Sequence, residues 1–154
     1  MNKEDVLIID VLDKNEAFNK IYKHLLKNDS VTKDFIQMIK EREKNYPTGM
    51  DLSVIGKDIP NIAIPHTEPY CVKKTGIVAV KLKRKIKFNN MIDPDKELFV
   101  KFLFVILNSG DGEQTDILAH IMDFVTKDSN IKDFFNINTT EEIYNYLKKN
   151  FYKE

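Results

Sequence analysis

The sequence contains few residues of the kinds that crosslink, separate or kink a chain. It has one cysteine, no tryptophan, five glycines and five prolines among 154 residues. The lone Cys71 excludes an internal disulfide and a multi-cysteine metal site, as is usual in a reducing compartment. We expect Cys71 to be a small buried residue, and the alternative is an exposed thiol. No linker rich in proline, glycine or serine and no internal repeat is present, so we expect one domain.

The sequence also lacks a net charge and a long hydrophobic run. Its 24 basic residues balance 24 acidic ones, so no overall field favours nucleic acid or anionic lipid. The longest apolar run, residues 98–107, is about half the length that a membrane-spanning helix needs. The apolar run at residues 6–9 follows acidic residues and has no small-residue cleavage site. We therefore expect a cytoplasmic protein without direct membrane insertion.

Strands are predicted where β-branched and apolar residues run together or alternate. These segments are residues 6–12, 61–66, 76–82 continuing through 81–88, and 98–107, the last as a central strand buried on both faces. The alternation at 81–88 places Lys81, Lys83, Lys85 and Lys87 on one solvated face. Without interleaved aromatic residues, this face is a poor candidate for a nucleic-acid patch.

Helices are predicted from apolar residues at helical spacing and from capping residues. Asp13 with Glu16 opens the first, Ser30 is expected to cap a second that must end by Tyr46, and Thr139 with Glu142 opens the last. Two more are expected at residues 117–125 and 131–135. The order of one strand, two helices, three strands and three helices is typical of a single α/β domain with helices covering a mixed sheet.

Of the three histidines, His66 has the most distinctive setting. It ends an alternating segment directly after Pro65, and Pro69 follows three residues later. Proline fixes its own φ and restricts the preceding residue, so this backbone is a stiff mount for a reactive side chain. The alternative is that His66 ends a strand at the surface. His24 and His120 are expected on helix faces.

Arginine is rare in this lysine-rich chain, which contains only Arg42 and Arg84. Arg42 follows the apolar stripe of the second predicted helix, where a guanidinium must reach solvent or meet an anion, and its planar fork suits phosphate oxygens. The alternative is an arginine that the helix dipole favours near a helix C-terminus. Nucleotide-binding glycine motifs and clustered zinc ligands are absent from the sequence, and Gly110 with Gly112 before a helix is only a weak anion signal.

Two segments of the sequence resemble a known family. Residues 62–68, Ile-Ala-Ile-Pro-His-Thr-Glu, are similar to the active-site segment of enzyme IIA domains of the fructose/mannitol class in the sugar phosphotransferase system, especially the galactitol-like branch. Upstream, Arg42-Glu43 and Pro47-Thr48-Gly49 resemble the preceding stretch of those domains. The resemblance covers essentially the whole chain. It implies a single enzyme IIA domain with a mixed sheet of about five strands flanked by helices on both faces.

The resemblance implies a phosphoryl relay without a cofactor or metal. The carrier protein HPr would donate to His66, which would pass the group to a cysteine of enzyme IIB, coupled to sugar uptake by the membrane enzyme IIC. Arg42 would bind the phosphoryl oxygens, with Thr48 and Thr67 as further donors. Gln114 stands where many members have a second histidine, and it is either a phosphate donor or a capping partner of Asp111. Asn61 replaces a common glycine.

Two other functions are compatible with the sequence. A regulatory phosphoprotein on the same fold would accept phosphate from HPr and signal by phosphorylation-dependent protein binding. A plain binding domain would carry an inert His66. Because the relay passes only phosphate, the sugar contacts belong to the membrane partner.

Overall fold

The computed structural model describes residues 1–110 and 117–152. Within them, a five-stranded mixed sheet has the order β1-β4-β5-β3-β2. The strands are β1 (Val6–Ile9), β2 (Gly49–Met50), β3 (Asn61–Ala63), β4 (Gly76–Asn89) and β5 (Glu97–Leu107). The most apolar segment is β5, which lies at the centre of the sheet as predicted.

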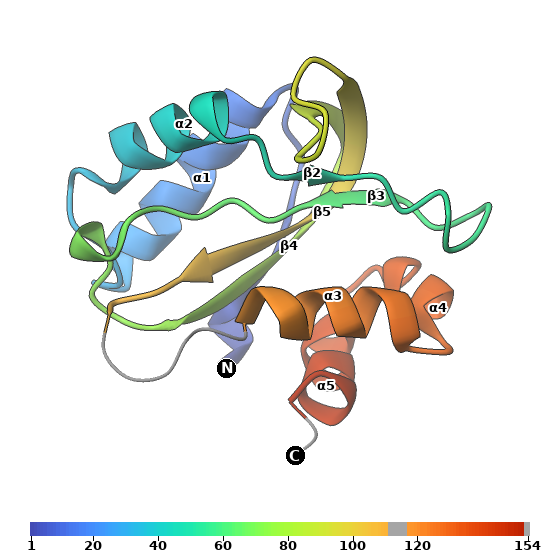
Figure 1. Ribbon diagram of the computed structural model, residues 1–154. Coiled ribbons are helices and arrows are strands. Elements are labelled where there is room, and N and C mark those ends of the chain that lie inside the picture. Colours follow the sequence, from blue (N-terminus) through green and yellow to red (C-terminus); the bar gives the residue numbers. More distant parts are fainter. Residues whose placement is uncertain (111–116, 153–154) are drawn as a thin grey trace.

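Helices cover both faces of the sheet (Figure 1). One face carries α1 (Lys14–Lys27) and α2 (Phe35–Asn45), and the other carries α3 (Ile117–Lys127), α4 (Ile131–Phe135) and α5 (Thr140–Asn150). Two short 3-10 helices, η1 (Lys3–Asp5) and η2 (Pro69–Cys71), complete the order. The predicted single α/β domain is confirmed. None of the described helices is long and apolar enough to cross a membrane.

The capping predictions are confirmed at two helices and wrong at one. The Glu16 amide donates to Asp13 Oδ1 at 2.9 Å, and the Glu142 amide donates to Thr139 Oγ1 at 3.2 Å. Helix α2, however, begins at Phe35 after Asp34 rather than at Ser30. Ser30 is buried, and its carbonyl accepts from the Lys73 amide at 2.8 Å. Pairing with this segment, which is distant in the sequence, holds the residues where a helix was expected.

Two predicted strands are shorter than expected, and one strand was not predicted. The first ends at Ile9 and the second at Ala63. Beyond Ala63 the Ile64 amide bonds to Thr48, and Pro65 has no amide hydrogen to continue a ladder. Strand β2, which has two residues, is too short for a detectable alternation.

The sheet separates two hydrophobic layers. Ala63 packs with the layer under α1 and α2, whereas Ile62 and Ile64 pack with the layer under α3–α5. The second layer is rich in aromatic rings, with the Phe102 and Phe104 centroids 4.9 Å apart. The segment leading to the candidate site is therefore fixed by apolar packing on both faces.

The predicted solvated lysine face is correct except at Lys81. Lys83, Lys85 and Lys87 are exposed, but Lys81 is only 8% exposed. The chain following α4 covers this position, and the Lys81 ammonium donates to the Phe135 and Ile137 carbonyls and to Asn138 Oδ1. The alternation predicted the face of the strand, but it did not show how far the helical layer extends over it.

Gly49 provides a test of backbone packing at the sheet edge. A Cβ at this position would lie 2.5 Å from the Asn89 carbonyl oxygen, whereas a Cβ on Gly76 would meet nothing within 4 Å. We expect Gly49→Ala to lower the free energy of unfolding by roughly 1–3 kcal/mol, because the backbone at Asn89 must move to make room for the added Cβ. Gly76→Ala should change it by no more than about 1 kcal/mol. Urea unfolding of both variants makes the comparison, and equal effects would contradict it.

Candidate functional site

His66 lies just beyond β3 on a backbone held from both sides. The Ile64 amide donates to the Thr48 carbonyl at 3.3 Å and to Thr48 Oγ1 at 3.2 Å. On the other side, the Ile106 amide of β5 donates to the Pro65 carbonyl at 3.0 Å, and His66 forms an isolated bridge with Ile106. The residues that deliver His66 are thus hydrogen-bonded to both neighbouring segments, in addition to the restriction imposed by Pro65.

The His66 ring is half-buried and oriented by a backbone carbonyl. Its Nδ1 lies 2.9 Å from the Ile64 carbonyl oxygen. Since a carbonyl oxygen can only accept, Nδ1 carries a proton, and in the neutral form of the ring Nε2 keeps its lone pair. Nε2 has no hydrogen-bond partner in the described part of the chain. In this tautomer, Nε2 is the atom of the neutral imidazole that can act as a nucleophile.

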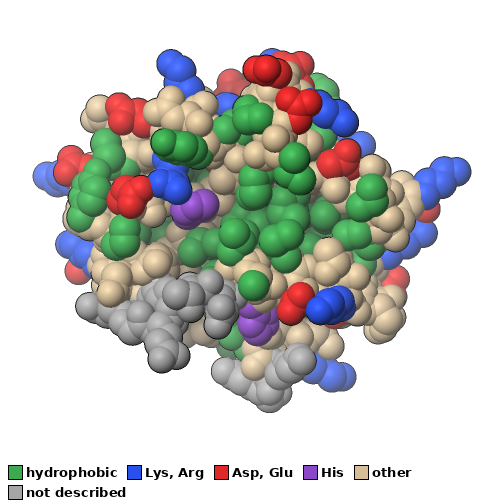
Figure 2. Space-filling view, in the orientation of Figure 1, with side chains coloured by type: hydrophobic (Ala, Val, Ile, Leu, Met, Phe, Trp, Pro, Cys, Tyr) green, Lys and Arg blue, Asp and Glu red, His purple; other side chains and the backbone are tan. Residues whose placement is uncertain are grey.

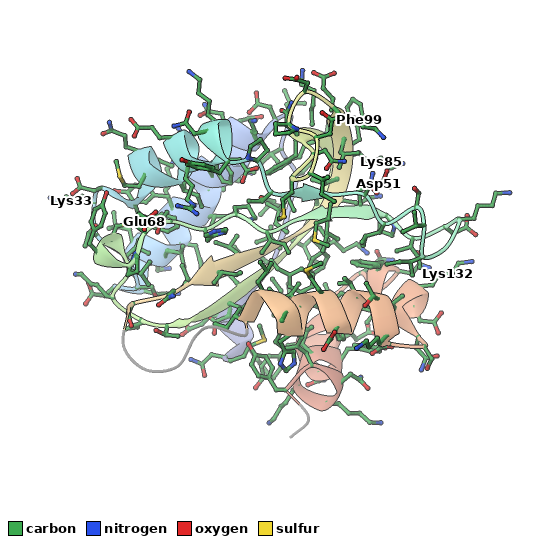
Figure 3. All side chains as sticks on the ribbon, viewed as in Figure 1. Lys33, Asp51, Glu68, Lys85, Phe99 and Lys132 are labelled. Atoms are coloured by element: carbon green, nitrogen blue, oxygen red, sulfur yellow. The ribbon has the colours of Figure 1, made fainter. Side chains whose placement is uncertain are left out.

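Arg42 is brought to the His66 segment through Glu68. Its Nη1 donates to Glu68 Oε1, two residues beyond His66, and its guanidinium carbon lies 5.3 Å from the centre of the Tyr46 ring. Figure 2 shows a histidine at the surface beside adjoining basic and acidic side chains, with a hydrophobic area on its other side. In Figure 3, Glu68 lies on the same side of the molecule, below α2. The anion that Arg42 contacts is thus the Glu68 carboxylate.

The guanidinium of Arg42 can bind another anion in addition to, or in place of, Glu68. The Glu68 side chain is 58% exposed, and an exposed ion pair contributes little net stability. The buried Arg42 Nε has no acceptor among the described residues. Phosphate oxygens can therefore compete with Glu68 for the guanidinium at a small cost in stability.

A buried carboxyl group that the sequence analysis did not single out supports this arrangement. Glu43 accepts from the Thr48 amide and from Thr48 Oγ1, both at 2.7 Å. Burial raises the pKa of Glu43 to about 7, although the two hydrogen bonds to Thr48 act in the opposite direction. Glu43 follows Ile39 by four residues, so helical spacing from the apolar stripe was the available signal. The innermost charged residue of α2 is Glu43 rather than Arg42.

The other predicted donors are placed as follows. The Thr48 hydroxyl donates to Glu43. The Thr67 hydroxyl donates to the Glu68 carbonyl at 3.0 Å and accepts from Cys71 Sγ at 3.0 Å. Both threonines are buried, so in this arrangement their hydroxyl groups hold the protein itself. Gln114, with Asp111 and Gly112, lies outside the described residues.

The remaining histidines occupy helix positions, as predicted. His24 contacts Asn28 one turn along α1 at 3.2 Å. His120 Nε2 lies 2.7 Å from the Phe151 carbonyl oxygen, which ties α3 to the end of α5. Over residues 1–110 and 117–152, no group of three or more His, Cys, Asp or Glu side chains is placed to hold a metal ion. Cys71 is buried, as expected.

Solved structures with the same fold include two enzyme IIA proteins. An enzyme IIA of the mannitol system from Escherichia coli, solved in complex with its phosphorylated enzyme IIB, superimposes with a TM-score of 0.74 at 20% identity, covering 96% of each chain. The nitrogen regulatory protein IIA-Ntr from Neisseria meningitidis gives 0.68 at 19% identity, covering 95% of this chain and 94% of its own. At these identities the likeness shows the fold.

Sequence comparison gives a curated relative and a family. The mannitol-specific EIICBA component of Buchnera aphidicola is 24% identical over 151 residues, which are 96% of this chain. The chain spans 22% of the length of that relative. Residues 1–150 match the family described as "Phosphoenolpyruvate-dependent sugar phosphotransferase system, EIIA 2". The chain therefore belongs to the EIIA 2 family of the sugar phosphotransferase system, the fructose/mannitol class of enzyme IIA.

Proposed function

We propose that this chain carries phosphoryl groups in sugar uptake, in the cytoplasm. His66 accepts the group from phospho-HPr and passes it to a cysteine of an enzyme IIB, which serves a membrane enzyme IIC. The observation that supports this role most directly is the contact between His66 Nδ1 and the Ile64 carbonyl, because it leaves Nε2 available for attack. Family membership supports the phosphocarrier chemistry, and the complex of the E. coli relative supports an enzyme IIB as partner.

The proposed transfer uses the two ring nitrogens in different ways. The Nε2 lone pair forms a bond to phosphorus while the phosphorus–nitrogen bond of the donor phosphohistidine breaks. The His66 ring keeps its Nδ1 proton and becomes positively charged, and the Ile64 carbonyl stabilises that charge. Transfer to the enzyme IIB thiolate then breaks the Nε2–phosphorus bond and returns a neutral ring.

Arg42 is the proposed electrostatic partner of the phosphoryl group. Phosphoryl transfer has a loose transition state with negative charge on the peripheral oxygens, so correctly placed cations are the main requirement. The guanidinium would exchange part of its contact with Glu68 for those oxygens. Thr48 and Thr67 could donate to phosphate only by giving up their present hydrogen bonds. Gln114 stays a proposed phosphate donor through its side-chain amide.

A regulatory role on the same fold is the second candidate. The structural relative named nitrogen regulatory protein IIA-Ntr is the observation that favours it. Such a protein would accept phosphate on His66 and have no enzyme IIB to receive it. Transfer to the cysteine of candidate enzyme IIB proteins distinguishes the two roles. The galactitol-like branch stays a prediction from residues 42–49 and 62–68.

The phosphorylation site is tested with enzyme I, HPr and phosphoenolpyruvate. We expect intact mass spectrometry to show one added phosphoryl group on the wild-type protein and none on His66→Ala, because no other histidine is held on the same kind of rigid backbone. His120→Ala is the matched control and should be labelled normally. Labelling of His66→Ala at the wild-type rate would refute the proposal.

The guanidinium is tested by a pair of substitutions. Arg42→Lys keeps the charge but loses the planar fork, and we expect the rate of phosphoryl acceptance to fall roughly tenfold or more. Glu68→Gln removes the competing carboxylate and should leave the rate unchanged or raise it. Rapid-quench measurement of phospho-protein formation gives both rates. A loss with Glu68→Gln as large as that with Arg42→Lys would show that the ion pair, rather than phosphate binding, matters.

Glu43 predicts a specific pH dependence of stability. Its folded-state pKa of about 7 lies above the ordinary value of 4.5, so the folded protein binds more protons than the unfolded chain between these values. The resulting stabilisation is fully present below about pH 4.5 and is lost as the pH rises through 7. Glu43→Gln should flatten the pH profile in this window, by at most about 1.4 kcal/mol per pH unit.

The measurement is urea unfolding of both proteins at intervals from pH 5 to pH 8. Glu41→Gln, on the exposed side of the same helix, is the control and should reproduce the wild-type profile. Parallel profiles for the wild type and Glu43→Gln would contradict a raised pKa of Glu43.

A further inference from the structure

A cavity lined by lysine lies on the α4 side of the sheet, away from His66. It has a volume of about 610 Å³ and lies between the middle of β4, the start of β5, the end of α4 and the loop before β3. The positively charged side chains of its lining are Lys57, Lys81, Lys83, Lys85 and Lys101. Five ammonium groups around one cavity stand out in a chain whose net charge is zero.

The carboxylates near this cavity already have partners. Asp58 is the acidic residue of the lining, and it pairs with Lys132 at 3.0 Å. Asp10 accepts hydrogen bonds of 2.7 and 3.1 Å from Arg84, and these bonds hold the pKa of Asp10 below its ordinary value. The charge of nearby Lys83 acts in the same direction. Among the described residues, the five lysines of the cavity have no carboxylate within ion-pair distance.

Lys81 is buried, so its positive charge without a counter-charge matters more than that of the exposed lysines. Its ammonium donates to three neutral oxygens and to no anion, as described for the fold. Burial, followed by the charge of Lys101, lowers the pKa of Lys81. A buried charge without a counter-charge is costly, and an anion in the adjacent cavity would offset that cost.

The rest of the lining indicates the kind of anion. Ile8, Ile59, Pro60 and Phe135 contribute apolar surface, and Asn136 and Asn138 contribute amides. A small inorganic ion would leave most of 610 Å³ unused. We propose that this cavity binds an organic phosphate of nucleotide size carrying two or more negative charges, with the lysines on its phosphates and the apolar surface on its organic part.

The proposed site is distinct from the phosphoryl-transfer site. His66 bridges to Ile106 near the end of β5, whereas Lys101 lies five residues earlier on the same strand, about 16 Å away at the rise of an extended chain. Figure 3 shows Lys85 and Lys132 on one side of the molecule and Glu68 on the other. The cavity and His66 therefore lie at separate places on the molecule.

The test is calorimetric titration with ATP, AMP and pyrophosphate, without magnesium, at low and physiological ionic strength. We expect saturable one-to-one binding of ATP, tighter than that of AMP or pyrophosphate and weaker at higher salt. Lys83→Gln/Lys85→Gln should weaken ATP binding by about a hundredfold, since each of the two lost charged contacts is worth about a factor of ten. Both lysines are exposed, so this variant should fold.

Lys87→Gln/Lys96→Gln is the matched control, because it removes the same charge from exposed lysines outside the lining. It should bind ATP within twofold of wild type. Equal losses in both double variants would overturn the site, because they would show attraction by overall charge. Absence of saturable ATP binding would overturn it too. Equal affinity for pyrophosphate and ATP would overturn the assignment of an organic ligand.

Discussion

The candidate site depends on the hydrogen bonds that Thr48 makes in two directions. Its amide and hydroxyl bind the buried Glu43 carboxyl, and its carbonyl and hydroxyl oxygens bind the Ile64 amide. Through these bonds the end of α2 is attached to the segment that contains Ile64, and the Ile64 carbonyl orients His66. The helix that carries Arg42 and the segment that carries the imidazole are therefore held as one unit. Positioning of this kind is what phosphoryl transfer requires of a protein.

Most of the architecture was predictable because it follows from local patterns. The caps at Asp13 and Thr139, the helix end before Pro47 and the apolar β5 each have a signal within a few residues. Ser30 was misassigned because serine is favoured both at the N-cap of a helix and in turns. Its pairing with Lys73, which is far away in the sequence, places Ser30 outside the helix. Strand β2 and the burial of Lys81 depend on which segments pack together, and periodicity does not encode that information.

The sequence indicated the central residue of the candidate site more clearly than its surroundings. The two prolines and the scarcity of arginine indicated His66 and Arg42. The partners of those residues, the Ile64 carbonyl and Glu68, became apparent only from the fold. Neighbouring residues on a helix point about 100° apart, so a shift of one position on the α2 stripe decided whether Arg42 or Glu43 would be innermost.

The burial of Cys71 has a consequence for the direction of transfer. It is the chain's only thiol, five residues from His66, and it lies inside the protein with its sulfur on the Thr67 hydroxyl and the Glu68 carbonyl. A solvent-accessible sulfur so close to a phosphorylated imidazole would compete as an internal acceptor. Because this one is enclosed, the proposed relay would need a second protein to deliver the group to sulfur, and the energy of the phosphorus–nitrogen bond would be conserved until that protein docks.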